Sequence, residues 1–196
     1  MSSLHKFESL IANFFGAKYA VSTDCCTHAV ELCLRLKEYD NVSCPNHTYL
    51  SIPMTFNKLG LSWKFDKMNW EDYYYIGNTN IIDAAVLWKE NSYIPGTFMC
   101  LSFQFKKHLS LGRGGMILLD NEKDYVDLKA MVYDGRERDI PWAEQNISKM
   151  GYHYYMTPEV AEAGIDKFNI VKNITPKKWN YLNYPNLENM EVFKNV

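Results

Sequence analysis

The 196-residue chain has no excess of basic residues, because 21 lysines and arginines stand against 23 aspartates and glutamates. A nucleic-acid binder usually carries a basic surplus, so we expect no nucleic-acid partner. The sequence also lacks an apolar run long enough to cross a bilayer, and its first residues lack the apolar segment of a signal peptide. We therefore expect a cytoplasmic protein with no membrane partner.

Paired cysteines are absent as well, since the chain has five cysteines and none is spaced as C-x-x-C. The odd count and the spacing argue against a zinc site and against a secreted disulfide framework. We expect reduced, mostly buried cysteines and no metal site. The chain does have 47% hydrophobic residues, which is typical of a folded domain and excludes a disordered chain.

Apolar periodicity and capping residues predict helices and strands in alternation. Thr27 is the predicted N-cap of the second helix, and Thr157 followed by Pro158 begins the last one. The predicted helices cover residues 4–15, 27–37, 49–59, 122–131 and 157–168. The predicted extended segments cover residues 18–23, 41–44, 61–65, 81–82, 98–103 and 116–119. Residues 66–80 and 134–150 are predicted to be irregular connections.

This alternation predicts an α/β fold, which we expect to be a three-layer sandwich with a mostly parallel sheet. Ligands of such sheets gather at the carboxyl ends of the strands. Three groups lie at such ends: residues 25–27 before a helix, Asp83 after a short strand, and the loop of residues 102–107. Residues 169–196, which are rich in Asn, Lys and Pro and have no clear period, are predicted to be a C-terminal tail.

Each of the three groups has an ordinary interpretation and a chemical one. Thr27 at a helix start is an N-cap or part of a phosphate site. Asp83 is a turn residue or a buried carboxylate that needs a cationic partner such as a protonated ring nitrogen. Lys107 is a solvated surface lysine or, if desolvated, an amine that forms a Schiff base. Together the three chemical interpretations match the needs of pyridoxal phosphate (PLP).

Several segments carry a more specific pattern. They are Phe7–Val21, Cys25–Thr27, Pro45–Tyr49, Ile82–Ala85, Ser102–Gly115 and Gly151–Thr157. In this order they resemble the motifs of the DegT/StrS-type sugar aminotransferases, which are PLP enzymes of fold type I. The Ile82–Ala85 segment is similar to the family's Asp-Ala-Ala, and the Ser102–Gly115 segment to its Ser-Phe-x-x-x-Lys loop. The resemblance spans about residues 7–168, and it implies that the fold is a reduced form of the family's large domain.

The resemblance also implies roles for residues of this chain. Lys107 would form the Schiff base with the cofactor and afterwards act as acid and base, and Asp83 would pair with the pyridinium nitrogen. Tyr49 would stack on the ring, and His153 would reach the cofactor of a partner subunit. The implied cofactor-binding residues are Cys26, Thr27, Tyr49, Asp83, Ser102, Lys107 and His153.

The activity implied by the resemblance is transfer of an amino group from an amino acid such as glutamate to a nucleotide-linked keto-sugar. The site would lie at the interface of a homodimer. Residues 1–168 would form the PLP-binding domain, and residues 169–196 would stand in place of the family's small domain. The alternative is a PLP-binding or non-catalytic shortened homologue that acts as a regulatory or interaction module.

The sequence departs from the family pattern at several places. The stretch between Phe65 and Ile81 is short, so we expect one wall of the substrate cleft to be missing. At single positions, Cys26 replaces Gly, Val86 replaces Gln, Arg113 replaces an acidic residue, His153 replaces Asn and Tyr155 replaces Arg.

Overall fold

Helices and strands alternate along the chain in the computed structural model, which describes residues 2–194. The helices are α1 (Ser3–Phe15), α2 (Cys26–Lys37), α3 (Ser51–Leu59), α4 (Glu122–Met131) and α5 (Pro158–Val171). The strands are β1 (Tyr19–Thr23), β2 (Asn41–Pro45), β3 (Ser62–Asp66), β4 (Tyr74–Tyr75), β5 (Ile81–Asp83), β6 (Phe98–Ser102) and β7 (Gly115–Leu119). Every predicted helix is confirmed to within three residues at its ends. The connection predicted over residues 66–80 is wrong in one respect, because it contains β4.

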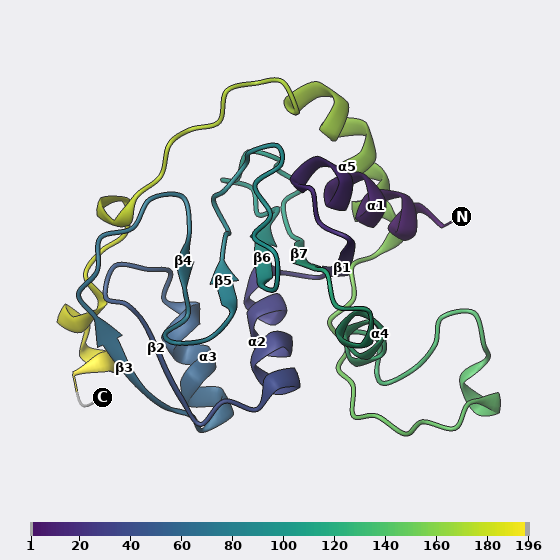
Figure 1. Ribbon diagram of the computed structural model, residues 1–196, viewed down its shortest axis with the longest axis horizontal. Coiled ribbons are helices and arrows are strands. Elements are labelled where there is room, and N and C mark those ends of the chain that lie inside the picture. The colour runs from purple at the N-terminus through teal and green to yellow at the C-terminus, as the bar shows by residue number, and fades with distance from the viewer. Residues whose placement is uncertain (1, 195–196) are drawn as a thin grey trace.

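The main sheet has the strand order β1-β7-β6-β5-β4, and β2 and β3 form a separate parallel pair (Figure 1). In the main sheet only β5 and β6 pair in parallel, whereas the other three pairs are antiparallel. The α/β class is therefore confirmed, and the expectation of a mostly parallel sheet is wrong. The reason is that the 103–114 connection has no helix, so β6 and β7 are adjacent antiparallel neighbours.

Strand direction nevertheless brings the predicted strand ends together. Because β1 and β6 each pair antiparallel with β7, they run in the same direction, and β5 is parallel to β6. The carboxyl ends of these strands, at Thr23, Asp83 and Ser102, therefore lie along one edge of the sheet. The first residue of β7, Gly115, pairs with both Thr23 and Ser102 at this edge.

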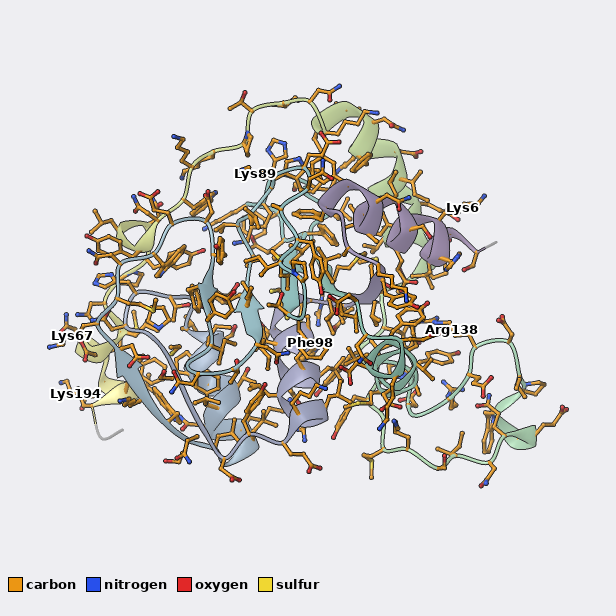
Figure 2. The ribbon with its side chains drawn as sticks, viewed as in Figure 1. Lys6, Lys67, Lys89, Phe98, Arg138 and Lys194 are labelled. Carbon is orange, nitrogen blue, oxygen red and sulfur yellow. The ribbon has the colours of Figure 1, made fainter. Side chains whose placement is uncertain are left out.

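Two apolar cores cover the two faces of the sheet and make the three layers that the sequence predicts. Alternate strand residues point to opposite faces. Ile82, Met99 and Leu118 pack with α1 and α5, whereas Ile81, Phe98 and Ile117 pack with α2. Phe98 is buried, while the side chains of Lys6, Lys67, Lys89, Arg138 and Lys194, also labelled in Figure 2, are exposed.

Helix starts differ from the prediction at α2. Its N-cap is Cys25 rather than Thr27, and the Cys25 side chain makes no capping hydrogen bond. Thr27 lies inside the helix, and its hydroxyl is 2.8 Å from that of Ser51. The last helix does begin after Thr157 with Pro158, as predicted, and it ends at Val171 rather than at Phe168. No helix within residues 2–194 has the length and apolarity that a bilayer span requires.

After α5 the chain crosses the upper side of the molecule in Figure 1 and returns beside β3. This tail contains three 3-10 turns at Tyr181–Asn183, Leu187–Asn189 and Glu191–Phe193. Leu187 and Phe193 are buried, and the Phe193 ring lies 5.7 Å from the Phe65 ring. The tail is therefore docked on the body of the protein. Residues 1, 195 and 196, which the predicted domain and tail include, lie outside the described residues.

Candidate cofactor site

A cavity of about 820 Å³ opens at the shared edge of β1, β5 and β6. Its lining includes six of the seven residues that the sequence predicts as cofactor-binding: Cys26, Thr27, Tyr49, Asp83, Ser102 and Lys107. The seventh, His153, lines a separate pocket of about 340 Å³. Arg113 and Gly114 line both pockets, so the two are neighbours.

Asp83 is a buried carboxylate with fixed orientation. Its Oδ2 accepts a hydrogen bond of 2.6 Å from the Tyr74 hydroxyl, and its Oδ1 accepts one of 3.0 Å from the Ala85 N–H. Burial raises the pKa of Asp83, while the Tyr74 and Ala85 hydrogen bonds and the positive charge of Lys107 offset only part of this effect. A cation brought next to Asp83 would therefore favour the ionised carboxylate and would lower the pKa of Asp83.

Lys107 lies in the turn after β6, where its N–H donates to the Gln104 carbonyl over 2.8 Å. Burial lowers the pKa of Lys107, and the nearby Lys106 lowers it further, although Asp83 and Cys26 oppose the shift. A lowered pKa gives more of the neutral, nucleophilic amine at neutral pH. Lys106 is exposed by comparison, so the structure gives Lys107 the more suitable surroundings of the two.

The start of α2 approaches β7 without side chains between them. A Cβ on Gly115 would lie 2.5 Å from the Cys25 carbonyl carbon and 2.6 Å from the Cys26 nitrogen, so this position requires glycine. The Cys26 side chain is buried, and its thiol donates to the Cys100 carbonyl over 3.5 Å. The side chain that replaces the family's glycine is thus held in the core. The backbone N–H groups of this helix start remain suited to an anion.

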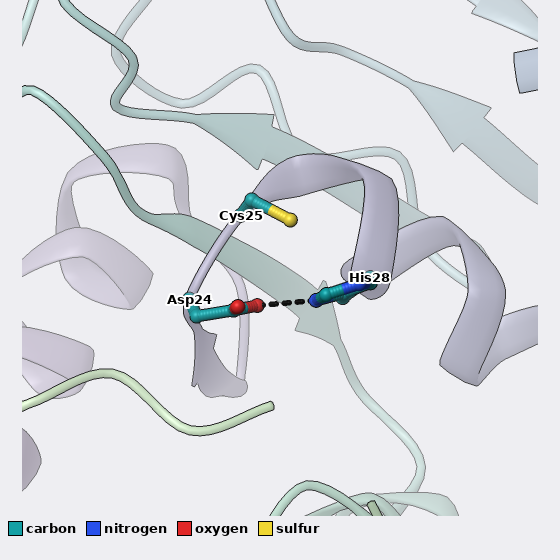
Figure 3. A group of neighbouring side chains, drawn as sticks. All are labelled: Asp24, Cys25 and His28. Atoms are coloured by element: carbon teal, nitrogen blue, oxygen red, sulfur yellow. Dashed lines mark hydrogen bonds and ion pairs between the residues drawn. The ribbon is translucent and has the colours of Figure 1, made fainter. Parts of the chain in front are cut away.

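Asp24, Cys25 and His28 form a cluster beside the same helix start (Figure 3). One possible metal-ligating atom from each residue lies within 4.8 Å of the others. Within residues 2–194 this is the group whose side chains are close enough to share a metal ion. Asp24 already has two partners, however, since its Oδ1 lies 2.6 Å from His28 Nδ1 and its Oδ2 lies 2.6 Å from the Arg113 guanidinium. Burial alone would lower the pKa of His28, but hydrogen bonds to Asp24 and Cys25 outweigh burial and raise it to about 9. The cluster is therefore an ion-paired brace between α2 and Arg113.

Several cavity residues were missed by the sequence analysis. Tyr74 and Trp70, to which no role in the site was assigned from the sequence, are buried and also line the cavity. Tail residues Lys177, Trp179 and Tyr184 line it too, although the tail was interpreted only as an appendage. The one available signal was the aromatic content of residues 179–184 within an otherwise polar tail.

Comparison with known proteins identifies relatives of this chain. The model of the DegT/DnrJ/EryC1/StrS aminotransferase family matches residues 2–75 and 94–188. An uncharacterized protein of Methanocaldococcus jannaschii is 24% identical over 217 residues, which cover 82% of this chain and 55% of that protein. Among solved structures, a protein from Actinomadura melliaura has a TM-score of 0.74 at 20% identity, over 86% of this chain and 60% of the other. A sugar aminotransferase from Micromonospora echinospora has a TM-score of 0.71 at 14% identity, with the same coverage of both chains.

The structural similarities show a shared fold. The chain spans only 55% to 60% of the length of these relatives. The family match, in contrast, extends over most of the chain and includes the cavity residues Cys26, Thr27, Tyr49, Ser102 and Lys107, whereas Asp83, Ala85 and Val86 lie outside the matched segments. On this evidence the chain belongs to the DegT/DnrJ/EryC1/StrS aminotransferase family.

Proposed function

We propose that this chain is a PLP-dependent aminotransferase that transfers an amino group from an amino acid such as glutamate to a nucleotide-linked keto-sugar. The observation that carries the proposal is that Asp83 and Lys107 line one cavity, where burial raises the pKa of Asp83 and lowers the pKa of Lys107. Aminotransferases of the family use PLP, which supports the choice of cofactor.

The residues present fit PLP. The start of α2, with Thr27 and Ser102 nearby, offers N–H and hydroxyl donors for a phosphate. Asp83 is a buried carboxylate whose hydrogen-bond donors in residues 2–194 are the neutral Tyr74 hydroxyl and Ala85 N–H, and a protonated ring nitrogen would provide a cationic partner. Tyr49 is 56% exposed at the cavity, so its ring is available to stack on a cofactor.

When bound, PLP supplies an electron sink for the substrate carbon that loses a proton. The residues of the chain do the remaining work. Tyr74 and the Ala85 N–H hold the Asp83 carboxylate in one orientation, so it can keep a proton on a ring nitrogen. Lys107, whose lowered pKa makes proton exchange easier near neutrality, accepts a proton at Nζ and returns it to another position.

A homodimer with His153 at the partner's site is part of the proposal. His153 is exposed and lies 3.1 Å from an Asp134 oxygen, in the pocket that shares Arg113 with the main cavity. The division into a cofactor-binding domain over residues 1–168 and a tail over residues 169–196 also belongs to the proposal, as does a cytoplasmic location. The five free cysteines fit a reducing compartment.

The test is an absorption spectrum of the purified protein with added PLP, followed by borohydride reduction and peptide mapping. We expect a Schiff-base band, with the reduced adduct on Lys107, and loss of both in Lys107→Ala. Lys106→Ala is the matched control and should keep them. An adduct scattered over surface lysines would contradict the proposal.

A second candidate is favoured by the departures from the family pattern at Val86, Arg113 and Tyr155. It is a PLP-binding or non-catalytic homologue that regulates or completes another protein. Turnover of glutamate with a keto-sugar nucleotide separates the two candidates, since a regulatory homologue would show none even if Lys107 forms the adduct.

A further inference from the structure

The C-terminal tail packs against the 66–80 connection and lines the cavity beside it. Its backbone is hydrogen-bonded to that connection: the Asp72 N–H donates to the Trp179 carbonyl over 3.0 Å, and the Tyr181 N–H donates to the Trp70 carbonyl over 3.1 Å. Farther along, the Tyr184 carbonyl lies 2.8 Å from His47 Nδ1, and the Leu187 N–H donates to the Asn46 carbonyl over 2.8 Å. The tail is thus fixed by the residues that follow β2 and β3.

Aromatic rings connect the tail to the buried carboxylate. The Trp179 and Tyr184 rings lie 6.1 Å apart, Tyr184 and Trp70 lie 5.5 Å apart, and Trp70 and Tyr74 lie 5.2 Å apart. Tyr74 in turn donates to Asp83. This series of four rings forms a continuous wall along the cavity, and two of the four come from the tail.

Two ammonium groups meet at the Trp179 ring. Lys107 Nζ lies 5.4 Å from the ring centroid, and Lys177 Nζ lies 4.1 Å from it, both within the range of a cation–π contact. Lys177 has no carboxylate within ion-pair distance in residues 2–194. Along the whole cavity the charged side chains are Lys106, Lys107, Arg113, Lys177 and one acid, Asp83, so the cavity attracts anions.

We propose that the tail supplies the substrate-facing wall of this cavity, and that Lys177, held against Trp179, binds the anionic group of the substrate. The inference rests on the proposed function. The chemistry recognised is a carboxylate or a phosphate, which the amino-acid donor and the nucleotide-linked acceptor respectively carry. Trp179 acts as a positioning residue, because its ring holds Lys177 at the cavity and also borders Lys107.

The experiment uses the full chain loaded with PLP and measures binding of two probes by calorimetry. Glutarate supplies carboxylates without an amino group to transfer, and uridine diphosphate supplies phosphates. We expect Lys177→Ala to weaken at least one probe by about fivefold, in line with an exposed ion pair of about 1 kcal/mol. The probe that is weakened identifies the anionic group. Lys178→Ala, one residue along and also exposed, is the matched control and should bind both probes as the wild type does.

Trp179→Leu and Trp179→Phe test the positioning role. We expect the leucine variant to weaken the same probe at least as much as Lys177→Ala, and the phenylalanine variant to restore part of the loss because it keeps a ring face. Unfolding in urea shows whether either Trp179 variant has lost its structure. If one has, Lys177→Ala still tests the proposal, because Lys177 is exposed and its substitution should leave the fold intact.

The outcomes separate the two proposals. If the wild type forms no Lys107 adduct with PLP, the proposed function fails. If the adduct forms but neither probe binds, or Lys177→Ala and Lys178→Ala bind both probes equally well, the role of the tail is overturned and the proposed function stands.

Discussion

The two sides of the cavity are built in different ways. The inner side consists of strand ends and the start of α2, where Asp83 and Lys107 are desolvated by the sheet and its two cores. The outer side is the tail segment of residues 177–184, which docks through backbone hydrogen bonds and is partly exposed. The inner side therefore has the burial that shifts the pKa values of Asp83 and Lys107. The outer side depends on anchors such as Leu187, which lie beyond the cavity.

The largest expected effect is on the inner side. Asp83→Asn keeps the shape and removes the charge, so we expect turnover of glutamate with a keto-sugar nucleotide to fall by about a hundredfold or more. The Lys107 adduct should still form, because the lysine is untouched. Wild-type turnover in this variant would contradict the role given to Asp83.

One substitution at a buried anchor should release the tail from the body of the protein. Leu187→Ala removes a fully buried side chain that anchors the tail, and we expect a loss of about 3 kcal/mol in the free energy of unfolding. Probe binding should weaken while the Lys107 adduct persists. Leu182→Ala, in the same tail but 69% exposed, is the control and should leave stability within about 0.5 kcal/mol.

A smaller effect follows from His28 at the brace on the inner side. Its pKa in the folded protein, about 9, is higher than its ordinary value of 6.5. The stabilisation that protonated His28 gives to the folded protein is therefore complete below pH 6.5 and is lost as the pH rises through 9. We expect the free energy of unfolding to fall by on the order of 2 kcal/mol over this range, after allowing for solvent at the partly exposed ring.

Urea unfolding between pH 6 and pH 9.5 measures this loss. In His28→Gln the pH-dependent step should disappear, because the glutamine does not titrate. An equal step in the variant would assign it to other groups.

The smallest effect is expected at the hydrogen bond that orients Asp83. Tyr74→Phe removes a buried donor and should cost about 1 kcal/mol of stability in urea unfolding. Tyr73→Phe is a control at a neighbouring exposed tyrosine and should change little. If the two variants are equally stable, the Tyr74 hydroxyl contributes no net stabilisation.

Much of the inner side could be predicted because its signals are local. Asp83 ends a short apolar strand, and Lys107 follows another, so each was placed from a few neighbouring residues. The sequence predicts Thr27 as the N-cap of α2 because a hydroxyl is the usual capping group. In the structure Cys25 is the N-cap, and the Thr27 hydroxyl instead lies beside that of Ser51 in α3. Sheet direction was also misjudged, because strand pairing is decided across the fold rather than along the chain.

The sequence by itself determined which residues are apolar and which segments form the helices and most of the strands, and hence which polar groups lie at strand ends. Only the tertiary structure decided that β1, β5 and β6 share a direction and that tail residues line the cavity. The physical reason is that the tail docks largely through backbone N–H and carbonyl groups, which nearly every residue possesses. Such bonds leave no periodic pattern in the sequence, so Trp179 and Lys177 could be located only once the chain was folded.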